Sequence, residues 1–215
     1  MENTLAGLEN EFVQVRQKIL GREQLGIQDK VTLCLFSAAM HSRAIRAGDN
    51  LRNTLQQVHD MVTSLEKQHS TEPDTSRQTG MMVETAPQDM VIFSLEIETP
   101  LYMAMEMSIF VTDDDLGFIT SDTPCVWFNP KAHTFPPFYR SPGLAQEDIE
   151  VTLPLTPQHL LFLSHRKHPL YIDVNQKAVD EANRLARAHC AAEFVSWKGD
   201  TRPYWFELGK KPADA

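Results

Sequence analysis

The chain of 215 residues has few cysteines, few glycines and no long apolar run, and each shortage excludes a class of protein. Its three cysteines, Cys34, Cys125 and Cys190, lie far apart, which argues against a disulfide framework and against a zinc site of the CxxC type. The nine glycines are scattered singly, so the sequence holds no glycine-rich phosphate loop. The longest apolar stretch, residues 31–40, is too short to span a bilayer.

The sequence also lacks a basic segment. The formal net charge is -9, from 29 acidic and 20 basic residues, and the densest basic cluster is the short run 166–168. This balance argues against duplex nucleic acid or an anionic membrane as the main partner. Met1 is not followed by a charged and then apolar leader, so we expect a soluble cytoplasmic protein with free, reduced thiols.

What the sequence does contain is, first, a series of helical patterns. Apolar residues recur every three or four positions over residues 3–20, and Gly21 ends that pattern. A nearly all-apolar helix is expected over 28–46 and a third helix from residue 51 onward. We therefore assign residues 1–68 to a helical lobe.

The pattern disappears over residues 69–87, which are polar and contain Gly80 and two prolines. This composition predicts a polar linker or surface excursion between two lobes. Apolar structure resumes with a short helix expected over 91–97. Residues 101–109 alternate as in a strand, although their methionines and alanine also suit a helix.

Residues 88–215 are expected to form a β-rich lobe. A β-hairpin is predicted from 108–112 and 118–120 around an acidic turn, followed by strands at 149–154, 159–164 and 169–173. Asn175 then caps a helix that ends near His189, and residues 192–198 form a closing strand. The predicted fold class is α+β: an N-terminal helical lobe followed by a mainly antiparallel β-sheet lobe with one late helix.

Several stretches resemble a bacterial family catalogued as domain of unknown function 4238. They are FITSDTPCVWF, VTLPLTPQHLLFLS, the Asn175 that opens the last helix, and the pair LENEF and HSRAIR in the helical lobe. Members of that family usually carry a His-Tyr-Val-Pro-like segment ahead of the first helix, whereas this chain starts just before that helix. The resemblance implies the two-lobe layout and no established activity.

The segment Thr120-Ser121-Asp122-Thr123-Pro124 is the first candidate site. Asp122 could act as a catalytic base with Ser121 beside it and with Thr120 binding the ligand. Alternatively, Asp122 accepts bonds from backbone N–H groups two residues on, in an Asx turn. For this segment taken alone, the turn is the favoured interpretation, because Asp-x-Pro turns are common.

Arg43 is the second candidate, as a ligand-binding cation that reaches from the helical lobe toward the β-rich lobe. Arg46 lies three positions on and is expected to share its helix face, whereas His41 points elsewhere. No metal site is predicted, because the Asp113–Asp115 run lacks the ligand spacing of a calcium loop.

Two functional hypotheses follow. The leading one is a small-ligand-binding or hydrolytic site between the two lobes, which takes a small anionic ligand held by Arg43. The alternative is a non-catalytic protein–protein interaction module without an active site. The sequence indicates no particular cofactor.

Overall fold

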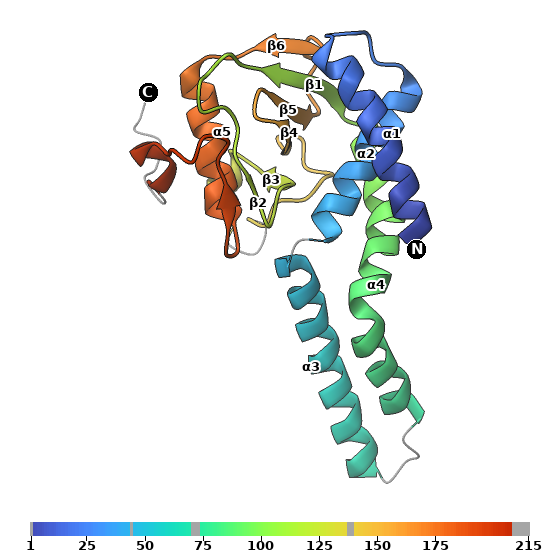
Figure 1. Cartoon of the computed structure of the whole chain (residues 1–215). Helices are drawn as coiled ribbons and strands as arrows, with labels where there is room; N and C mark the ends of the chain where they lie inside the picture. Colours follow the sequence, from blue (N-terminus) through green and yellow to red (C-terminus); the bar gives the residue numbers. More distant parts are fainter. Residues whose placement is uncertain (1, 44, 70–73, 137–139, 208–215) are drawn as a thin grey trace.

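The computed structural model describes residues 2–43, 45–69, 74–136 and 140–207. Five α-helices lie at α1 Glu2–Leu20, α2 Ile27–Ser42, α3 Ile45–His69, α4 Asp74–Met103 and α5 Gln176–His189, with short 3-10 turns at η1 Ala132–Thr134 and η3 Pro203–Phe206. The strands are β1 Glu106–Val111, β2 Thr120–Ser121, β3 Val126–Phe128, β4 Glu150–Thr156, β5 His159–Ser164, β6 Tyr171–Asp173 and β7 Phe194–Val195. Helices come first, then mainly strands and one late helix, so the α+β prediction is confirmed (Figure 1).

The helices of the first half are joined to one another through their ends. Asp29 accepts the N–H of Gly26 at 2.8 Å at the start of α2 and pairs with Lys18 of α1 at 2.8 Å. Lys30 donates to the carbonyls of Met103 and Met105, at 3.0 and 2.7 Å, where α4 ends. One turn of α2 therefore fixes the position of both α1 and the last turn of α4.

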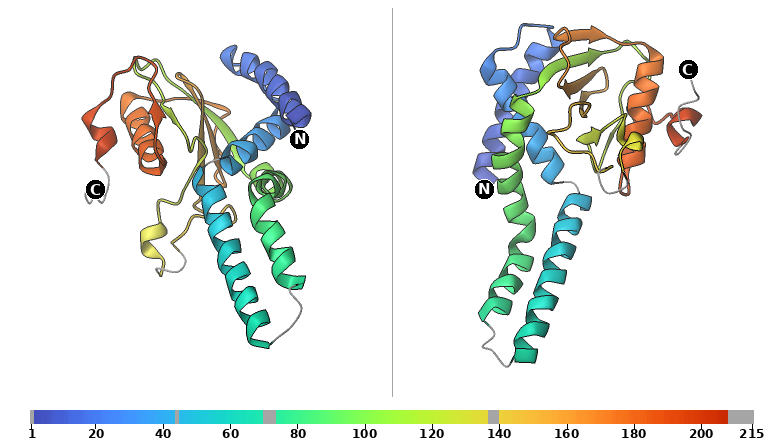
Figure 2. Two further views of the ribbon diagram at one scale, coloured as in Figure 1. Left: turned by 60° about the horizontal axis from the view of Figure 1, so that its bottom comes forward. Right: turned by 180° about the vertical axis from the view of Figure 1, so that it is seen from behind.

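The two longest helices, α3 and α4, lie side by side and extend away from the rest of the molecule in every view (Figures 1 and 2). Residues 69–87 were expected to form a polar linker or excursion, but His69 ends α3 and residues 74–87 are the first half of α4, while residues 70–73 lie outside the described residues. Glu66 of α3 accepts the N–H of Ser76 at 3.0 Å in the first turn of α4, and His59 bonds to Thr79 at 2.9 Å. Residues 74–87 lack an apolar pattern that would predict a helix. They become helical because side chains of α3 form hydrogen bonds with polar groups in the first turns of α4.

The main sheet has the strand order β3-β4-β5-β1-β6, and only β6 runs parallel to its neighbour, β1. The predicted hairpin between 108–112 and 118–120 is wrong, because β1 pairs with β5 and β6, while β2 pairs with β7 in a separate two-stranded sheet. Gly117, at φ 61°, turns the chain so that the N–H of Phe118 bonds to the carbonyl of Pro157 at 2.7 Å. The expected strand over 192–198 is reduced to the two residues of β7.

The sheet lies between the N-terminal helices and α5 (Figure 2), and an apolar cluster packs on each of its faces. Alternate residues such as Ile109, Val151 and Leu161 pack against α1, α2 and α4 in the larger core. Phe162 faces the other side, where Val179 of α5 packs. This alternation follows the period of two along each strand. None of the three cysteines forms a disulfide, as the sequence indicated, and all three are buried.

Candidate functional site

A cavity of about 500 Å³ lies where the helices meet the end of the sheet. Its helical wall is Phe12 of α1 with Phe36 and Met40 of α2. Its other walls come from the β4 end and the 118–124 and 195–197 segments. The cavity is thus located between the helical and β-rich parts of the chain, and both Thr120 and Ser121 line it.

The walls of this interlobe cavity are mainly apolar and aromatic. The rings of Phe12 and Phe36 stack with centroids 3.9 Å apart and an interplanar angle of 5°. Trp197 also lines the cavity, and 64% of its surface is exposed. None of the described residues that line the cavity carries a charge. Such a surface favours flat apolar molecules over ions.

Three hydroxyl groups supply the polarity of the cavity. Thr156 bonds to His159 Nδ1 at 2.9 Å, so its hydroxyl is engaged within the protein. Ser121 Oγ accepts the N–H of Thr123 at 3.1 Å, which leaves its O–H free to donate. Thr120 is exposed, and its hydroxyl makes no hydrogen bond to any other described residue. Thr120 and Ser121 can therefore each offer a ligand one hydrogen bond.

Asp122 is directed away from this cavity and holds another part of the chain. Its Oδ1 accepts the N–H of Ala191 at 2.8 Å, and its Oδ2 accepts those of Ala192 at 2.6 Å and Glu193 at 3.0 Å. Desolvation acts to raise the pKa of this carboxyl, but the backbone N–H donors outweigh it and lower the pKa to about 2. A carboxylate with so low a pKa is a weak base.

The turn is therefore built differently from the Asx turn considered from the sequence. Two residues after Asp122 stands Pro124, which has no N–H to donate. The local hydrogen bond belongs to Ser121, and the bonds of Asp122 reach the segment that follows α5. Asp122 therefore connects β2 to the segment that follows α5.

Arg43 is also outside the interlobe cavity. Its guanidinium lies 3.3 Å from Glu9 of α1 in an exposed ion pair. The expectation that Arg43 and Arg46 share a helix face is wrong, because α2 ends at Ser42 and Arg46 belongs to α3. The side chain of Arg46 lies outside the described residues. The structure thus brings Thr120 and Ser121 together in the cavity and leaves Arg43 elsewhere.

A buried polar network joins α2, α4 and β3. Glu98 accepts hydrogen bonds from Ser94 at 3.0 Å and from Tyr102 at 3.2 Å, and it pairs with His41 Nδ1 at 2.9 Å. Trp127 of β3 donates to Tyr102 Oη at 2.8 Å and stacks on His41 with ring centroids 4.0 Å apart. Burial raises the pKa of Tyr102, so its phenol stays neutral and donates. This network fixes the helices on the sheet beside the cavity.

The sequence interpretation missed this network, although a signal was present. Ser94, Glu98 and Tyr102 are spaced four residues apart, which places three polar groups on one face of a helix.

Within the described ranges, no group of three His, Cys, Asp or Glu side chains could hold a metal ion. No described helix is long and apolar enough to cross a membrane.

Comparison with known families matches residues 1–199 to one described as "Protein of unknown function (DUF4238)". This match confirms the resemblance noted from the sequence. Comparisons with curated proteins and with solved structures find no match.

Proposed function

Since the chain belongs to the DUF4238 family, whose description names no activity, we propose a function from the geometry alone: the protein binds a small, neutral, largely aromatic molecule in the interlobe cavity. The observation that supports this most strongly is the cavity itself. It has about 500 Å³, walls from both halves of the chain and two unengaged hydroxyl donors. Volumes of this order suit ligands of drug-like size.

The uncharged lining favours a neutral ligand over the anionic one that the sequence suggested. An anion would need a cation or several N–H donors to replace its hydration, and no lining residue is cationic. The stacked Phe12 and Phe36 offer a flat apolar surface, and Trp197 offers a second. Thr120 and Ser121 would orient the ligand by hydrogen bonds to its polar group.

In this proposal Asp122 is a positioning residue rather than a catalytic base. It fixes the β2 turn that carries Thr120 and Ser121, because its oxygens hold the 191–193 segment. We therefore propose binding without hydrolysis. A base for hydrolysis would have to reach the ligand, and the carboxylate of Asp122 does not line the cavity.

Titration with Nile red, a neutral aromatic dye that fluoresces in apolar surroundings, tests the proposal. Leu155→Trp and Met40→Trp narrow the cavity from its two walls and should each weaken dye binding at least tenfold. Ser121→Ala tests the polar contact, and the loss of one hydrogen bond of about 1 kcal/mol corresponds to roughly fivefold weaker binding of a ligand that accepts it.

Met61→Ser is the control, because it removes an exposed apolar side chain on α3 that does not line the cavity. Dye binding should be unchanged in this variant. If Met61→Ser loses the dye while the two tryptophan variants keep it, the dye binds the α3–α4 hairpin and the cavity proposal fails. Thermal melts confirm that every variant is folded.

A second candidate function has one specific observation in its favour. Val58, Met61 and Leu65 are exposed on α3 and are spaced three and four residues apart, so they form one apolar stripe. Pairing of two such hairpins would bury both stripes in a four-helix bundle. Light scattering after size exclusion tests this self-association, and Met61→Lys should shift any dimer to monomer. A wild-type monomer at high concentration excludes it.

A further inference from the structure

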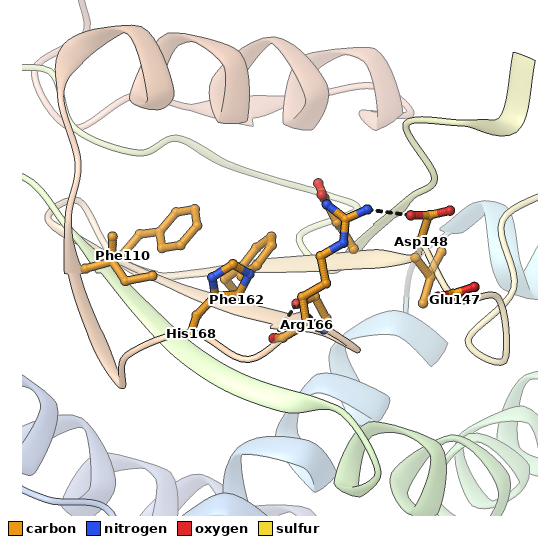
Figure 3. Close-up of a pocket in the computed structure, with 10 residues that line it drawn as sticks. Phe110, Glu147, Asp148, Phe162, Arg166 and His168 are labelled. Carbon is orange, nitrogen blue, oxygen red and sulfur yellow. Dashed lines mark hydrogen bonds and ion pairs between the residues drawn. The ribbon is translucent and has the colours of Figure 1, made fainter.

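A second cavity, of about 330 Å³, lies over the sheet between the β5–β6 connection and the segment that precedes β4 (Figure 3). It shares no lining residue with the interlobe cavity. Its lining combines aromatic rings with charged groups, whereas the interlobe cavity has no charged group. The two cavities therefore suit different chemical classes of ligand.

Two phenylalanines from neighbouring strands form the apolar side of this second cavity. Phe110 of β1 and Phe162 of β5 stack with ring centroids 4.6 Å apart and an interplanar angle of 20°. His168 meets Phe162 edge-on at 5.9 Å. Figure 3 shows these three rings beside one another, with Arg166 and Asp148 at the other end. The stacked pair can receive another aromatic ring.

The charges at the other end are unequal. Asp148 pairs with both Arg166, at 2.5 Å, and Lys131, at 2.9 Å. Glu150 and Glu147 also line the cavity. The three carboxylates thus face two full cations, and the excess charge is negative.

Glu150 is the group that lacks a partner. It projects from β4 and is only partly exposed, and its carboxyl makes no hydrogen bond or ion pair with any described residue. Burial raises the pKa of this carboxyl, and the positive charges of Arg166 and His168 only partly offset the effect. A half-buried carboxylate without a hydrogen-bonded partner is costly, so a cation that reaches it would gain a strong charge-assisted bond.

We propose that this second cavity binds a small aromatic amine, with the ammonium group on Glu150 and the ring on Phe110 and Phe162. An anionic ligand fits less well, because the guanidinium of Arg166 already donates to Asp148. The proposal is independent of the interlobe cavity and of any ligand found there.

Three probes that share a phenylethyl body test the charge requirement: 2-phenylethylamine, 2-phenylethanol and 3-phenylpropanoate. They are titrated into the whole protein, and binding is followed by calorimetry and by amide shifts in NMR spectra. The amine should bind at least tenfold more tightly than the alcohol or the acid, and the largest shifts should fall on β1, β5 and residues 147–150. Equal binding of the three probes, no binding of the amine, or shifts centred elsewhere would overturn the proposal.

Glu150→Gln keeps the shape of the side chain and removes its charge, so it should weaken amine binding about tenfold and leave binding of the alcohol unchanged. Glu147→Gln is the matched control, because Glu147 is an exposed carboxylate of the same cavity, and its loss should change amine binding less than threefold. Glu150→Gln should also leave Nile red binding unchanged. An unaltered amine affinity in a folded Glu150→Gln protein would contradict the role of Glu150 as the group that binds the ammonium. If the Glu150→Gln protein does not fold, the three probes titrated into the wild-type protein still test the cavity.

Discussion

At the scale of single residues, the chemistry of Asp122 depends on partners far away in the sequence. The residue type and its neighbours suggested a turn or a base, but its carboxylate accepts three backbone N–H bonds from residues about 70 positions later. Each bond satisfies a backbone N–H just after the end of α5, where α5 and β7 are joined. The carboxylate therefore connects the turn after β2 to the segment between α5 and β7.

Replacement of Asp122 should therefore lower the free energy of unfolding. Asp122→Ala removes acceptors for three N–H groups and should lower the free energy of unfolding by about 1–3 kcal/mol. Asp122→Asn keeps one oxygen but turns an NH₂ group toward N–H donors, so it should be destabilising as well, by a smaller amount. Urea unfolding measures both, and an unchanged midpoint for Asp122→Ala would show that the three bonds add no net stability.

The low pKa of Asp122 also predicts a pH dependence. Its pKa is about 2 in the folded protein and near 4 in an unfolded chain, so the carboxylate is favoured by folding. Its contribution is complete above about pH 4 to 5 and is lost as the pH falls toward 2. The difference in unfolding free energy between wild type and Asp122→Asn should therefore shrink over this interval. A difference that stays constant between pH 6 and pH 2.5 would contradict the assigned pKa.

At the scale of secondary-structure elements, the α3–α4 hairpin shows that contacts can create a helix from a polar stretch. Gly80 lies within α4, and a Cβ atom there would be 3.4 Å from His59, at ordinary contact distance. Gly117 has φ 61° and would place a Cβ atom 2.2 Å from the carbonyl oxygen of Pro157. A side chain therefore fits at position 80, whereas position 117 requires glycine.

Alanine at these two positions should change stability in opposite directions. Gly80→Ala should raise the free energy of unfolding by about 0.5–1 kcal/mol, because glycine is a poor helix former. Gly117→Ala should lower it by more than about 2 kcal/mol, since it combines a left-handed conformation with a clash. Circular dichroism during urea unfolding provides the measurement. A destabilised Gly80→Ala protein would contradict the helical pairing of residues 74–87 with α3.

At the scale of the whole molecule, the segment around η3 packs against α5 on the side of the molecule opposite the first helices (Figure 1). Trp205 is fully buried, and its indole N–H donates to Asp180 of α5 at 2.8 Å. Arg202 bridges Asp180 and Asp114 at 2.8 and 2.7 Å. Arg202 and Trp205 lie beyond the family match, which ends at residue 199, yet Trp205 completes a core with Ile119 and Ala186.

Loss of this closing contact should weaken the whole fold. Trp205→Ala should cost about 3–5 kcal/mol, the range for truncation of a large buried aromatic residue. Phe206→Ala is the neighbouring control and should cost only about 1 kcal/mol, because Phe206 is 46% exposed. Thermal unfolding compares the two variants. Equal losses would mean that η3 contributes through general surface coverage rather than through the buried indole.

The amino-acid sequence alone determined the features that depend on neighbours along the chain. The apolar periods placed α1, α2, β4 and β5, and Asn175 accepts the N–H of Ala178 as the predicted cap of α5. Such features follow from local backbone preferences and from one buried face per element. The family resemblance was available from the same local stretches.

Only the tertiary structure decided what depends on distant residues. It made residues 74–87 helical through Glu66 and His59 of α3, and it placed β1 between β5 and β6 instead of in a hairpin. It also separated Thr120 and Ser121, which line a cavity, from the adjacent Asp122, which does not. Pairing partners and the direction of a side chain are set by long-range packing, and the local pattern of a sequence carries no record of which distant segment will supply the contact.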